Sequence, residues 1–425
     1  MRILHTSDWH LGQFFINKSR LAEHKKFIAW LLEKVVEENI DAVIIAGDVF
    51  DTGSPPSYAR ELYNQFVIGM NAIGRQLIIL AGNHDSVSTL NESKDILAQL
   101  NTHVISAAGD CLEEQVIELN DQHGEVGAIL CAIPYLRPRD IMKSAAGESG
   151  EQKKQALGQA ITDHYQMLFS VAVKKRDGLK KTVPIIATGH LTAMGVTTSE
   201  SVRDIYIGSL EAFPASAFPP ADYIALGHIH RSQIVAKSDH IRYCGSPIPL
   251  SFDELGRQKQ VLIAEFCAGK LKSVEPLYIP LFQPMQVIKG NLESIEQQLT
   301  ELYGCEGIES DHKEAGNFHE GLATWLSIEV ETQDYLNDLQ QRMQLLTEKM
   351  NVEILQLRRA KKQRRERIES DSKEILAELN PMDVFERRLA LEVFATDAEQ
   401  EQLARLRQLF EKTVAAIDSE SVNEN

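Results

Sequence analysis

The sequence predicts an α/β protein in which a largely parallel sheet is flanked by helices. Three observations predict this fold class. Short apolar runs alternate with segments of helical spacing in the N-terminal part, as in successive β–α–β units. Several of these apolar runs lead into glycine and polar residues, where a strand gives way to a loop. The chain of 425 residues, 43% of them apolar, is long enough for two or three globular domains.

The elements of the first 280 residues follow from these patterns. Apolar runs predict strands at 3–6, 42–46, 77–81, 126–133, 183–188, 223–226, 241–244 and 261–266. Apolar side chains four positions apart, such as Phe27, Leu31 and Val35, show helical spacing. Helices are expected at 20–38, 57–73 and 152–173.

A second domain is expected at 284–368, because Pro280 and Pro284 interrupt the strand pattern. It reads as a small α+β domain. Its expected elements are strands at 285–289, 323–330 and 352–357 and helices at 292–302 and 336–347. The polar insertion at 303–321 is expected to form a loop.

A third segment, 380–418, is expected to form two helices, with Pro381 in the first turn of the first. Each helix carries an apolar stripe. The stripes are Val384, Phe385, Leu389, Val393 and Phe394, and Leu403, Leu406, Phe410, Val414 and Ile417. Such stripes pack either on the chain's own core or in a groove of a partner protein, and the pattern alone leaves both possibilities open.

Five short blocks carry the candidate chemistry, each combining Asp, Asn or His with glycine or with a similar residue two positions away. The blocks are Asp8-Trp9-His10, Gly47-Asp48-Val49-Phe50-Asp51, Gly82-Asn83-His84-Asp85, Gly189-His190 and Gly227-His228-Ile229-His230. One block alone is common in loops. All five together supply the ligands of a site for two divalent metals. Most of them follow an expected strand, and sites in open α/β sheets collect beyond the carboxyl ends of strands.

These residue types fit the hydrolysis of a phosphodiester. Two divalent cations neutralise the phosphate, lower the pKa of a bound water and hold the attacking and leaving oxygens in line. Such ions lie roughly 3.5–4 Å apart, so one carboxylate usually bridges them, and Asp48 is the central acid of the set. Imidazole, carboxylate and one amide oxygen together suit Mn, Fe or Zn better than Ca or Mg. The set lacks a thiolate, which argues against a structural zinc site.

Composition narrows the possible functions. The sequence has no run of 18 apolar residues and no basic-apolar leader, so neither a membrane span nor a secretion signal is expected. The five cysteines (111, 131, 244, 267 and 305) are expected to be free thiols in a reducing cytoplasm. A net charge of −17 is unusual for a DNA-binding protein. The basic run at 358–367 either neutralises DNA phosphates or forms a solvated face.

The five blocks resemble the calcineurin-like metallophosphoesterase superfamily, and residues 195–251 resemble its SbcD family, the nuclease subunits of bacterial SbcCD complexes. The segments that carry the closer resemblance are Ser199-Glu200-Ser201, Ile205-Tyr206-Ile207-Gly208, 225–233 and 243–252. The resemblance is dense over 1–280, where it implies a four-layer α/β/β/α sandwich. It also implies that 284–368 is a capping domain that positions DNA, the alternative being a domain that only adds stability.

The resemblance further implies a role for each site residue. Asp8, His10 and His230 would hold one metal, and Asn83, His190 and His228 the other, with Asp48 bridging both. His84 would face the scissile phosphate and protonate the leaving 3′ oxygen, a task suited to a side chain that titrates near neutrality. Asp85 either supports the site or belongs to a plain turn. Asp51 stands where some relatives have histidine, and it receives no role here.

The implied function is a DNA nuclease with two metal ions, for which Mn²⁺ is the expected choice. It would act as a double-strand 3′ to 5′ exonuclease and as an endonuclease on single strands and hairpins, in repair, recombination and replication. Its implied partners are an SbcC-like coiled-coil ATPase, docked on the C-terminal helices, and a second copy of the chain. Two alternatives are a phosphoesterase acting on a small nucleotide or phosphoprotein, and a non-catalytic scaffold for DNA ends. The expected cap, basic run and tail stripes count against the first, and the full ligand set against the second.

Overall fold

The computed structural model describes residues 1–109, 111–142, 149–179, 181–202, 212–303, 322–331 and 339–359, together with Arg405, Arg407 and Phe410. The chain divides into two compact units, Met1–Ala360 and Lys361–Asn425, and all elements named below belong to the first. Several predicted features lie outside the described residues. They are the tail helices apart from three residues, most of the basic run, nearly all of the 303–321 insertion and the motif at 205–208.

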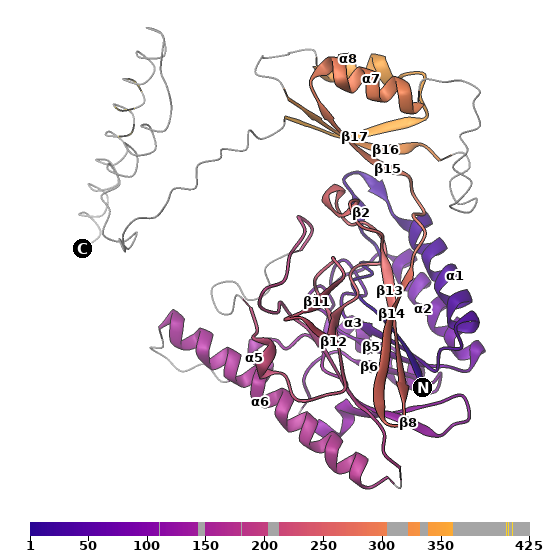
Figure 1. Cartoon of the computed structure of the whole chain (residues 1–425), viewed down its shortest axis with the longest axis vertical. Coiled ribbons are helices and arrows are strands. Elements are labelled where there is room, and N and C mark those ends of the chain that lie inside the picture. The colour runs from indigo at the N-terminus through magenta and orange to yellow at the C-terminus, as the bar shows by residue number, and fades with distance from the viewer. Residues whose placement is uncertain are drawn as a thin grey trace. The chain divides into compact units, whose positions relative to one another are not determined.

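A first sheet within the described residues has six strands in the order β14-β13-β1-β4-β5-β6. Figure 1 labels β13, β14, β5 and β6 of this sheet. Its strands are β1 (Arg2–Thr6), β4 (Ala42–Ala46), β5 (Gln76–Leu80), β6 (Thr102–Ile105), β13 (Gln260–Cys267) and β14 (Lys270–Tyr278). β1, β4, β5 and β6 are parallel, whereas β13 runs antiparallel to both of its neighbours. The carboxyl ends of the parallel strands therefore share one edge.

A second sheet, also of six strands in the described part of the chain, has the order β11-β12-β10-β9-β8-β7. Its strands are β7 (Val116–Asn120), β8 (Val126–Cys131), β9 (Ile185–His190), β10 (Tyr223–Gly227), β11 (Gln233–Val235) and β12 (Ser238–Tyr243). The four inner strands are parallel, and the edge strands β7 and β11 are antiparallel to their neighbours.

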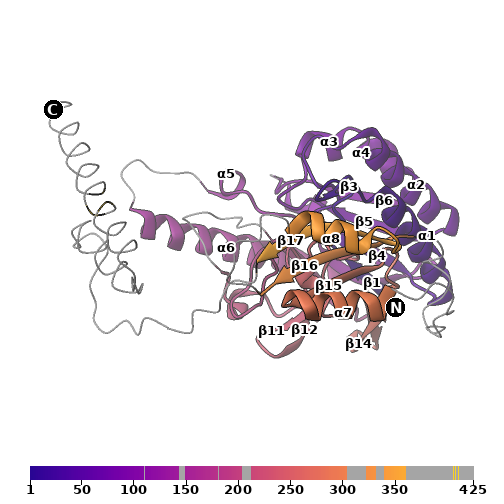
Figure 2. The same cartoon turned by 90° about the horizontal axis from the view of Figure 1, so that it is seen from above.

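Helices cover the outer faces of both sheets, which confirms the predicted four-layer sandwich. α1 (Leu21–Glu37) and α2 (Ser57–Ile73) pack on the first sheet, and α6 (Gly150–Asp177) packs on the second (Figure 2). Successive side chains of β4 point to opposite faces of the sheet, and this alternation forms the layers. Val43 packs in the core beneath the helices, and Ile44 packs in the core between the two sheets. Three separate apolar cores thus hold the sandwich together.

Shorter elements complete this domain. They are the hairpin of β2 (Phe14–Phe15) and β3 (Lys18–Ser19) and the helices α3 (Val87–Asn91), α4 (Lys94–Ala98) and α5 (Pro138–Ile141). The sequence patterns did not indicate β14, because most of its side chains are partly or fully exposed and lack an apolar run. A tight turn with positive φ at Ala268 (50°) and Gly269 (77°) pairs it with β13.

The C-terminal part of the first compact unit contains β15 (Met285–Gly290), α7 (Leu292–Tyr303), β16 (Thr324–Val330), α8 (Leu339–Thr347) and β17 (Val352–Arg359). Its strands form a parallel sheet with a core of its own, in which Ile328 packs with Leu299 and Met343. The five elements occur in the predicted order. Since the strands are parallel and alternate with helices, the arrangement consists of β–α–β units, the same alternation that predicts a parallel sheet in the first 280 residues.

Candidate two-metal site

The eight predicted site residues come together where the carboxyl ends of the parallel strands meet. The loops after β1, β4 and β5 supply five of them, the last residue of β9 is the sixth, and the loop after β10 supplies the other two. In the described part of the chain, potential ligand atoms within 4.8 Å of one another form three overlapping groups: Asp8–His10–His230, His10–Asp48–His84 and Asp48–His190–His228. The eighth residue, Asn83, lies beside the last group, with its Oδ1 3.0 Å from His190 Nε2 and 3.1 Å from His228 Nδ1.

Backbone strain marks the same residues. Asp8, His10, Asp48 and His228 have φ values of 54°, 47°, 49° and 95°. A non-glycine residue in this region costs about 1–3 kcal/mol and persists only where its surroundings impose it. Here the loops are tied together, because Asp8 N donates to Gly47 O and His228 N donates to Asp8 Oδ1 at 2.9 Å. Holding these side chains in place therefore lowers the stability of the fold.

Two glycines in the motifs are required by close packing at the site. A Cβ at Gly82 would lie 2.1 Å from Asp48 Oδ1. A Cβ at Gly227 would lie 1.9 Å from the carbonyl oxygen of Ala46 and 2.9 Å from His190 Nδ1. Either side chain would displace a predicted ligand, so these glycines belong to the site as much as the polar residues do.

The donor set fits cations. His190 Nδ1 donates to the Ala46 carbonyl at 2.9 Å, so Nε2 is the atom that faces Asp48 Oδ2 at 3.1 Å. In a neutral ring, Nε2 is an acceptor, and two acceptors at this distance repel unless positive charge lies between them. Burial alone lowers the pKa of His190, but the Asp48 carboxylate outweighs it and raises that pKa to about 9.

The other residues of the set also indicate that positive charge is needed among them. Burial acts to raise the pKa of Asp48, yet the surrounding histidines, His190 above all, hold it well below its ordinary value. The Nε2 atoms of His10 and His228 are buried without a hydrogen-bond partner. Ionised oxygens and unpartnered imidazole nitrogens in one buried cluster are a suitable ligand set for divalent metals of the Mn, Fe or Zn type.

Asp51 and Asp85 have clear structural roles, which the sequence left open. Asp51 Oδ1 lies 3.1 Å from His10 Nδ1, and the Asp51 carbonyl accepts from His84 Nδ1 at 2.7 Å. Asp85 is buried and accepts from the backbone N–H groups of Val49, Phe50 and Gly82 at 3.1, 2.9 and 2.8 Å. Burial, with the charge of Asp48, raises the pKa of Asp85 to about 6. Asp85 thus joins the loops that carry Asp48 and Asn83 and is more than a turn residue.

His84 occupies a position that fits two roles. It is partly exposed, whereas most of the other site residues are buried. Its backbone N–H donates to Asp48 Oδ1 at 2.8 Å. Its ring packs edge to face on that of His10, with the two ring centroids 4.8 Å apart. Since Nδ1 donates to a carbonyl, Nε2 is the atom that would meet a substrate or a metal. The geometry allows His84 to act either as a general acid or as a metal ligand.

A buried network behind His230 was not indicated by the sequence. Ser201 Oγ lies 2.6 Å from His230 Nδ1 and also bonds Glu254, which is buried. Lys259 Nζ donates to Glu254 Oε2 at 2.6 Å. Burial acts to raise the pKa of Glu254, but Lys259 outweighs it and keeps that pKa well below its ordinary value. The carboxylate behind His230 is therefore ionised.

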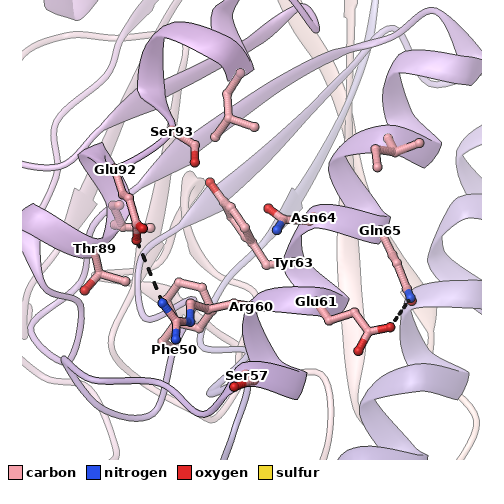
Figure 3. A pocket seen from close by; sticks show the side chains of 13 residues that line it. Phe50, Ser57, Arg60, Glu61, Tyr63, Asn64, Gln65, Thr89, Glu92 and Ser93 are labelled. Atoms are coloured by element: carbon pink, nitrogen blue, oxygen red, sulfur yellow. Dashed lines mark hydrogen bonds and ion pairs between the residues drawn. The ribbon is translucent and has the colours of Figure 1, made fainter.

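Two hollows adjoin this region. One, of about 520 Å³, lies between α2 and the α3–α4 segment, with Arg60 and Glu92 paired across it (Figure 3). None of the eight site residues lines this hollow, so it is not the predicted metal site. The other, of about 320 Å³, is lined by His230 together with Arg231, Arg257 and Lys259. Glu254 lines it as well, and Arg231 and Lys259 are paired with Asp253 and Glu254, so most of its positive charge is neutralised.

Groups without a predicted role behave as structural residues where the chain is described. Burial lowers the pKa values of His5 and His24 to about 3, so both stay neutral within the core. Cys111, Cys131, Cys244 and Cys267 are free thiols, and Cys305 lies outside the described residues. Among the residues that the structure describes, no helix is long and apolar enough to cross a membrane.

A four-layer sandwich with Asp, Asn and His side chains gathered at its strand ends is the architecture of a calcineurin-like metallophosphoesterase. The family described as calcineurin-like phosphoesterase matches residues 1–232. A second, described as type 5 capsule protein repressor C-terminal domain, matches residues 281–393. The first match covers more than half of the chain and shows a hydrolase family that uses divalent metal ions.

Curated relatives narrow the family. The chain is 52% identical over 420 residues to the SbcD subunit of the nuclease SbcCD from Escherichia coli K12, covering 99% of both chains. It is 36% identical over 299 residues to the SbcD subunit from Rhodobacter capsulatus (68% of this chain, 71% of the relative), and 30% identical over 290 residues to that from Bacillus subtilis (67% and 71%). The chain belongs to the SbcD family of metal-dependent nucleases.

Proposed function

We propose that the chain hydrolyses phosphodiester bonds of DNA with two Mn²⁺ ions, as a double-strand 3′ to 5′ exonuclease and as an endonuclease on single strands and hairpins. The observation that carries this proposal is the overlap of three potential ligand groups around Asp48. Mn²⁺ is favoured because the donors mix imidazole nitrogen with carboxylate and amide oxygen. A nucleic-acid substrate is favoured by the word nuclease in the names of the relatives.

Each site residue then has a task. Asp8, His10 and His230 would hold one metal, Asn83, His190 and His228 would hold the other, and Asp48 would serve both. The bound pair would supply neutralisation of the phosphate charge and a lowered pKa for a water molecule. The Asp51 carbonyl fixes Nδ1 of His84, so that a protonated ring presents Nε2–H to the leaving 3′ oxygen. The Asp85 carboxylate keeps the loops of Asp48 and Asn83 in register.

A substrate panel tests the proposal against its two alternatives. Labelled duplex ends and DNA hairpins are incubated with the chain and its ATPase in Mn²⁺ and ATP, beside small nucleotides and a phosphopeptide. Cleavage of the DNA substrates at rates far above those of the small ones supports the nuclease. Hydrolysis confined to the nucleotides or the phosphopeptide would favour the other phosphoesterase, and binding of DNA without cleavage would favour the scaffold.

We also infer a wider assembly. The relatives are named as one subunit of the nuclease SbcCD, which supports an SbcC-like coiled-coil ATPase as the partner. Residues 284–368 would act as the DNA-positioning cap, 380–418 as the docking helices, and two copies would act together. Ile68 on α2 and Ile96 on α4, 60% and 67% exposed, are apolar side chains that a second copy would cover. Sedimentation velocity measures that association. The free thiols fit a cytoplasmic location.

The tail stripes give a test of the ATPase partner. Replacing Phe385 and Leu389 by aspartate is expected to abolish complex formation, because a buried carboxylate without a partner is too costly at an apolar interface. The variant should keep its melting temperature and its metal-dependent cleavage of simple substrates, while losing ATP-stimulated processing of DNA ends. Co-purification with the ATPase measures the first effect. A variant that unfolds by itself would assign the stripe to the chain's own core.

The basic run gives a test of DNA contact. Arg358 pairs with Glu329 at 2.6 Å and with Glu200 at 3.5 Å, so its charge is already paired and it serves as the control. Replacing Arg359, Lys361 and Lys362 by glutamine is expected to flatten the salt dependence of DNA binding, by about 0.9 in log–log slope for each lost phosphate contact. Arg358→Gln should leave the slope unchanged. Binding measured from low to moderate salt checks this, and equal slopes for wild type and the triple variant would make the run a solvated face.

A further inference from the structure

The structure connects the Ser199-Glu200-Ser201 motif to a predicted metal ligand. The hydroxyl of Ser201 bonds both His230 Nδ1, at 2.6 Å, and Glu254 Oε1. Ser199 Oγ also donates to Glu254 Oε1, at 2.9 Å, but has no bond to His230. One serine of the motif therefore touches a site histidine and the other does not.

Counting hydrogens fixes the direction of these bonds. Ser201 has one hydroxyl hydrogen, and both Glu254 oxygens act as acceptors, Oε1 from Ser199 and Ser201 and Oε2 from Lys259 Nζ and the Leu250 N–H, so that hydrogen belongs to the Ser201–Glu254 bond. Ser201 Oγ must then accept from His230 Nδ1–H. A neutral imidazole that carries its hydrogen on Nδ1 has its lone pair on Nε2, the form that binds a metal. The relay from Glu254 through Ser201 therefore selects one tautomer of His230.

The carboxylate at the far end of the relay is itself held firmly. Lys259 Nζ donates to Glu254 Oε2 at 2.6 Å and to the backbone carbonyl of His230 at 3.0 Å. The Leu250 backbone N–H donates to the same oxygen of Glu254 at 3.0 Å. A buried carboxylate with a cation and several donors is rigid, and it keeps Ser201 in one orientation.

Two other proposed metal ligands, His10 and His190, also have an oxygen beside Nδ1. His10 Nδ1 lies 3.1 Å from Asp51 Oδ1, and His190 Nδ1 donates to the Ala46 carbonyl. An oxygen behind the distal nitrogen orients a metal-binding imidazole and raises its basicity. For His230 that oxygen is a hydroxyl polarised by a carboxylate.

We propose that Ser201 is a positioning residue which, with Glu254 behind it, holds His230 in the tautomer and orientation that bind one of the two metals. The inference rests on the proposed function, in which His230 is a metal ligand. It concerns one metal only, because Ser201 has no bond to a ligand of the Asp48–His190–His228 group.

Direct titration of the metal-free, full-length chain with Mn²⁺, followed by the electron paramagnetic resonance signal of free Mn²⁺, tests the proposal. Ser201→Ala is expected to weaken one of the two Mn²⁺ sites by about 10–100-fold, the usual effect of losing such a partner, and to leave the other unchanged. Ser201→Thr keeps the hydroxyl and should restore the site. Ser199→Ala, the matched control, removes the Ser199 bonds to Glu254 and, at 3.0 Å, to Ser201 Oγ, but it keeps the Ser201 hydroxyl between His230 and Glu254 and should bind both ions normally. The melting temperature of the metal-free Ser201→Ala variant should equal that of the wild type.

The outcomes separate this inference from the proposed function. Ser201→Ala binding both ions as tightly as the wild type would overturn the inference, and so would an equal loss in Ser199→Ala or no recovery in Ser201→Thr. His230→Ala provides the reference, because it should lose one Mn²⁺ site. If His230→Ala keeps both sites, the ligand assignment itself is wrong. If only His230→Ala loses a site, the assignment stands and the role of Ser201 falls.

Discussion

Asp48→Ala is expected to lose both metals and all cleavage. Asp48 Oδ2 lies 3.1 Å from His190 Nε2 and 3.7 Å from His10 Nε2, so one carboxylate reaches both proposed metal positions. Its other oxygen accepts from the backbone of His84 at 2.8 Å, which fixes the direction of the carboxylate. Removing it takes one ligand from each metal and leaves the surrounding histidines without their central negative charge.

Elemental analysis of the dialysed variant checks this result, with melting temperature as the control for folding. Asp48→Asn is the matched variant, because it keeps the shape of the side chain and removes only its charge. It should fold like the wild type and still fail to cleave. Two metals per chain retained in Asp48→Ala would show that Asp48 is not the bridge.

His84→Gln is expected to keep both metals and its DNA affinity while losing turnover by about 10²–10⁴-fold, the usual worth of general acid–base catalysis. The physical reason is that His84 is partly exposed beside the ligand groups, with Nδ1 held by the Asp51 carbonyl. Glutamine preserves a polar side chain of similar length but does not deliver a proton near neutral pH.

Single-turnover cleavage, metal content and DNA binding are measured on the same preparation. His103→Gln serves as a control, because His103 lies on β6 and belongs to none of the three ligand groups. A fall in metal content in His84→Gln would make His84 a ligand, which the His10–Asp48–His84 group permits.

Much of the sandwich could be predicted because its inner strands are buried on both faces. β4 and β5 are wholly buried and therefore read as continuous apolar runs. Edge strands carry no such signal. Most side chains of β14 are partly or fully exposed, and its pairing depends on a turn at Ala268 and Gly269 that apolar periodicity does not register. The pairing of distant strands, such as β1 with β13, is a property of the whole fold.

The predicted ligand residues could be found because chemistry restricts their types and the strand ends restrict their places. Their supporting residues carry no comparable signal. Glu254 lies 53 positions from Ser201, and an isolated glutamate in a polar stretch reads as a surface residue. Asp85 acts on backbone N–H groups, which any sequence supplies. Only the folded chain shows that these two carboxylates are buried beside the site.

Cleavage of DNA is proposed to require two metals held around Asp48. The most direct test titrates Mn²⁺ into the metal-free chain in the presence of its ATPase, ATP and a labelled DNA hairpin, and records bound Mn²⁺ and cleavage in the same samples. We predict that cleavage rises as the second Mn²⁺ binds and is absent in excess chelator. Full cleavage with one bound Mn²⁺, or with none, would contradict the claim.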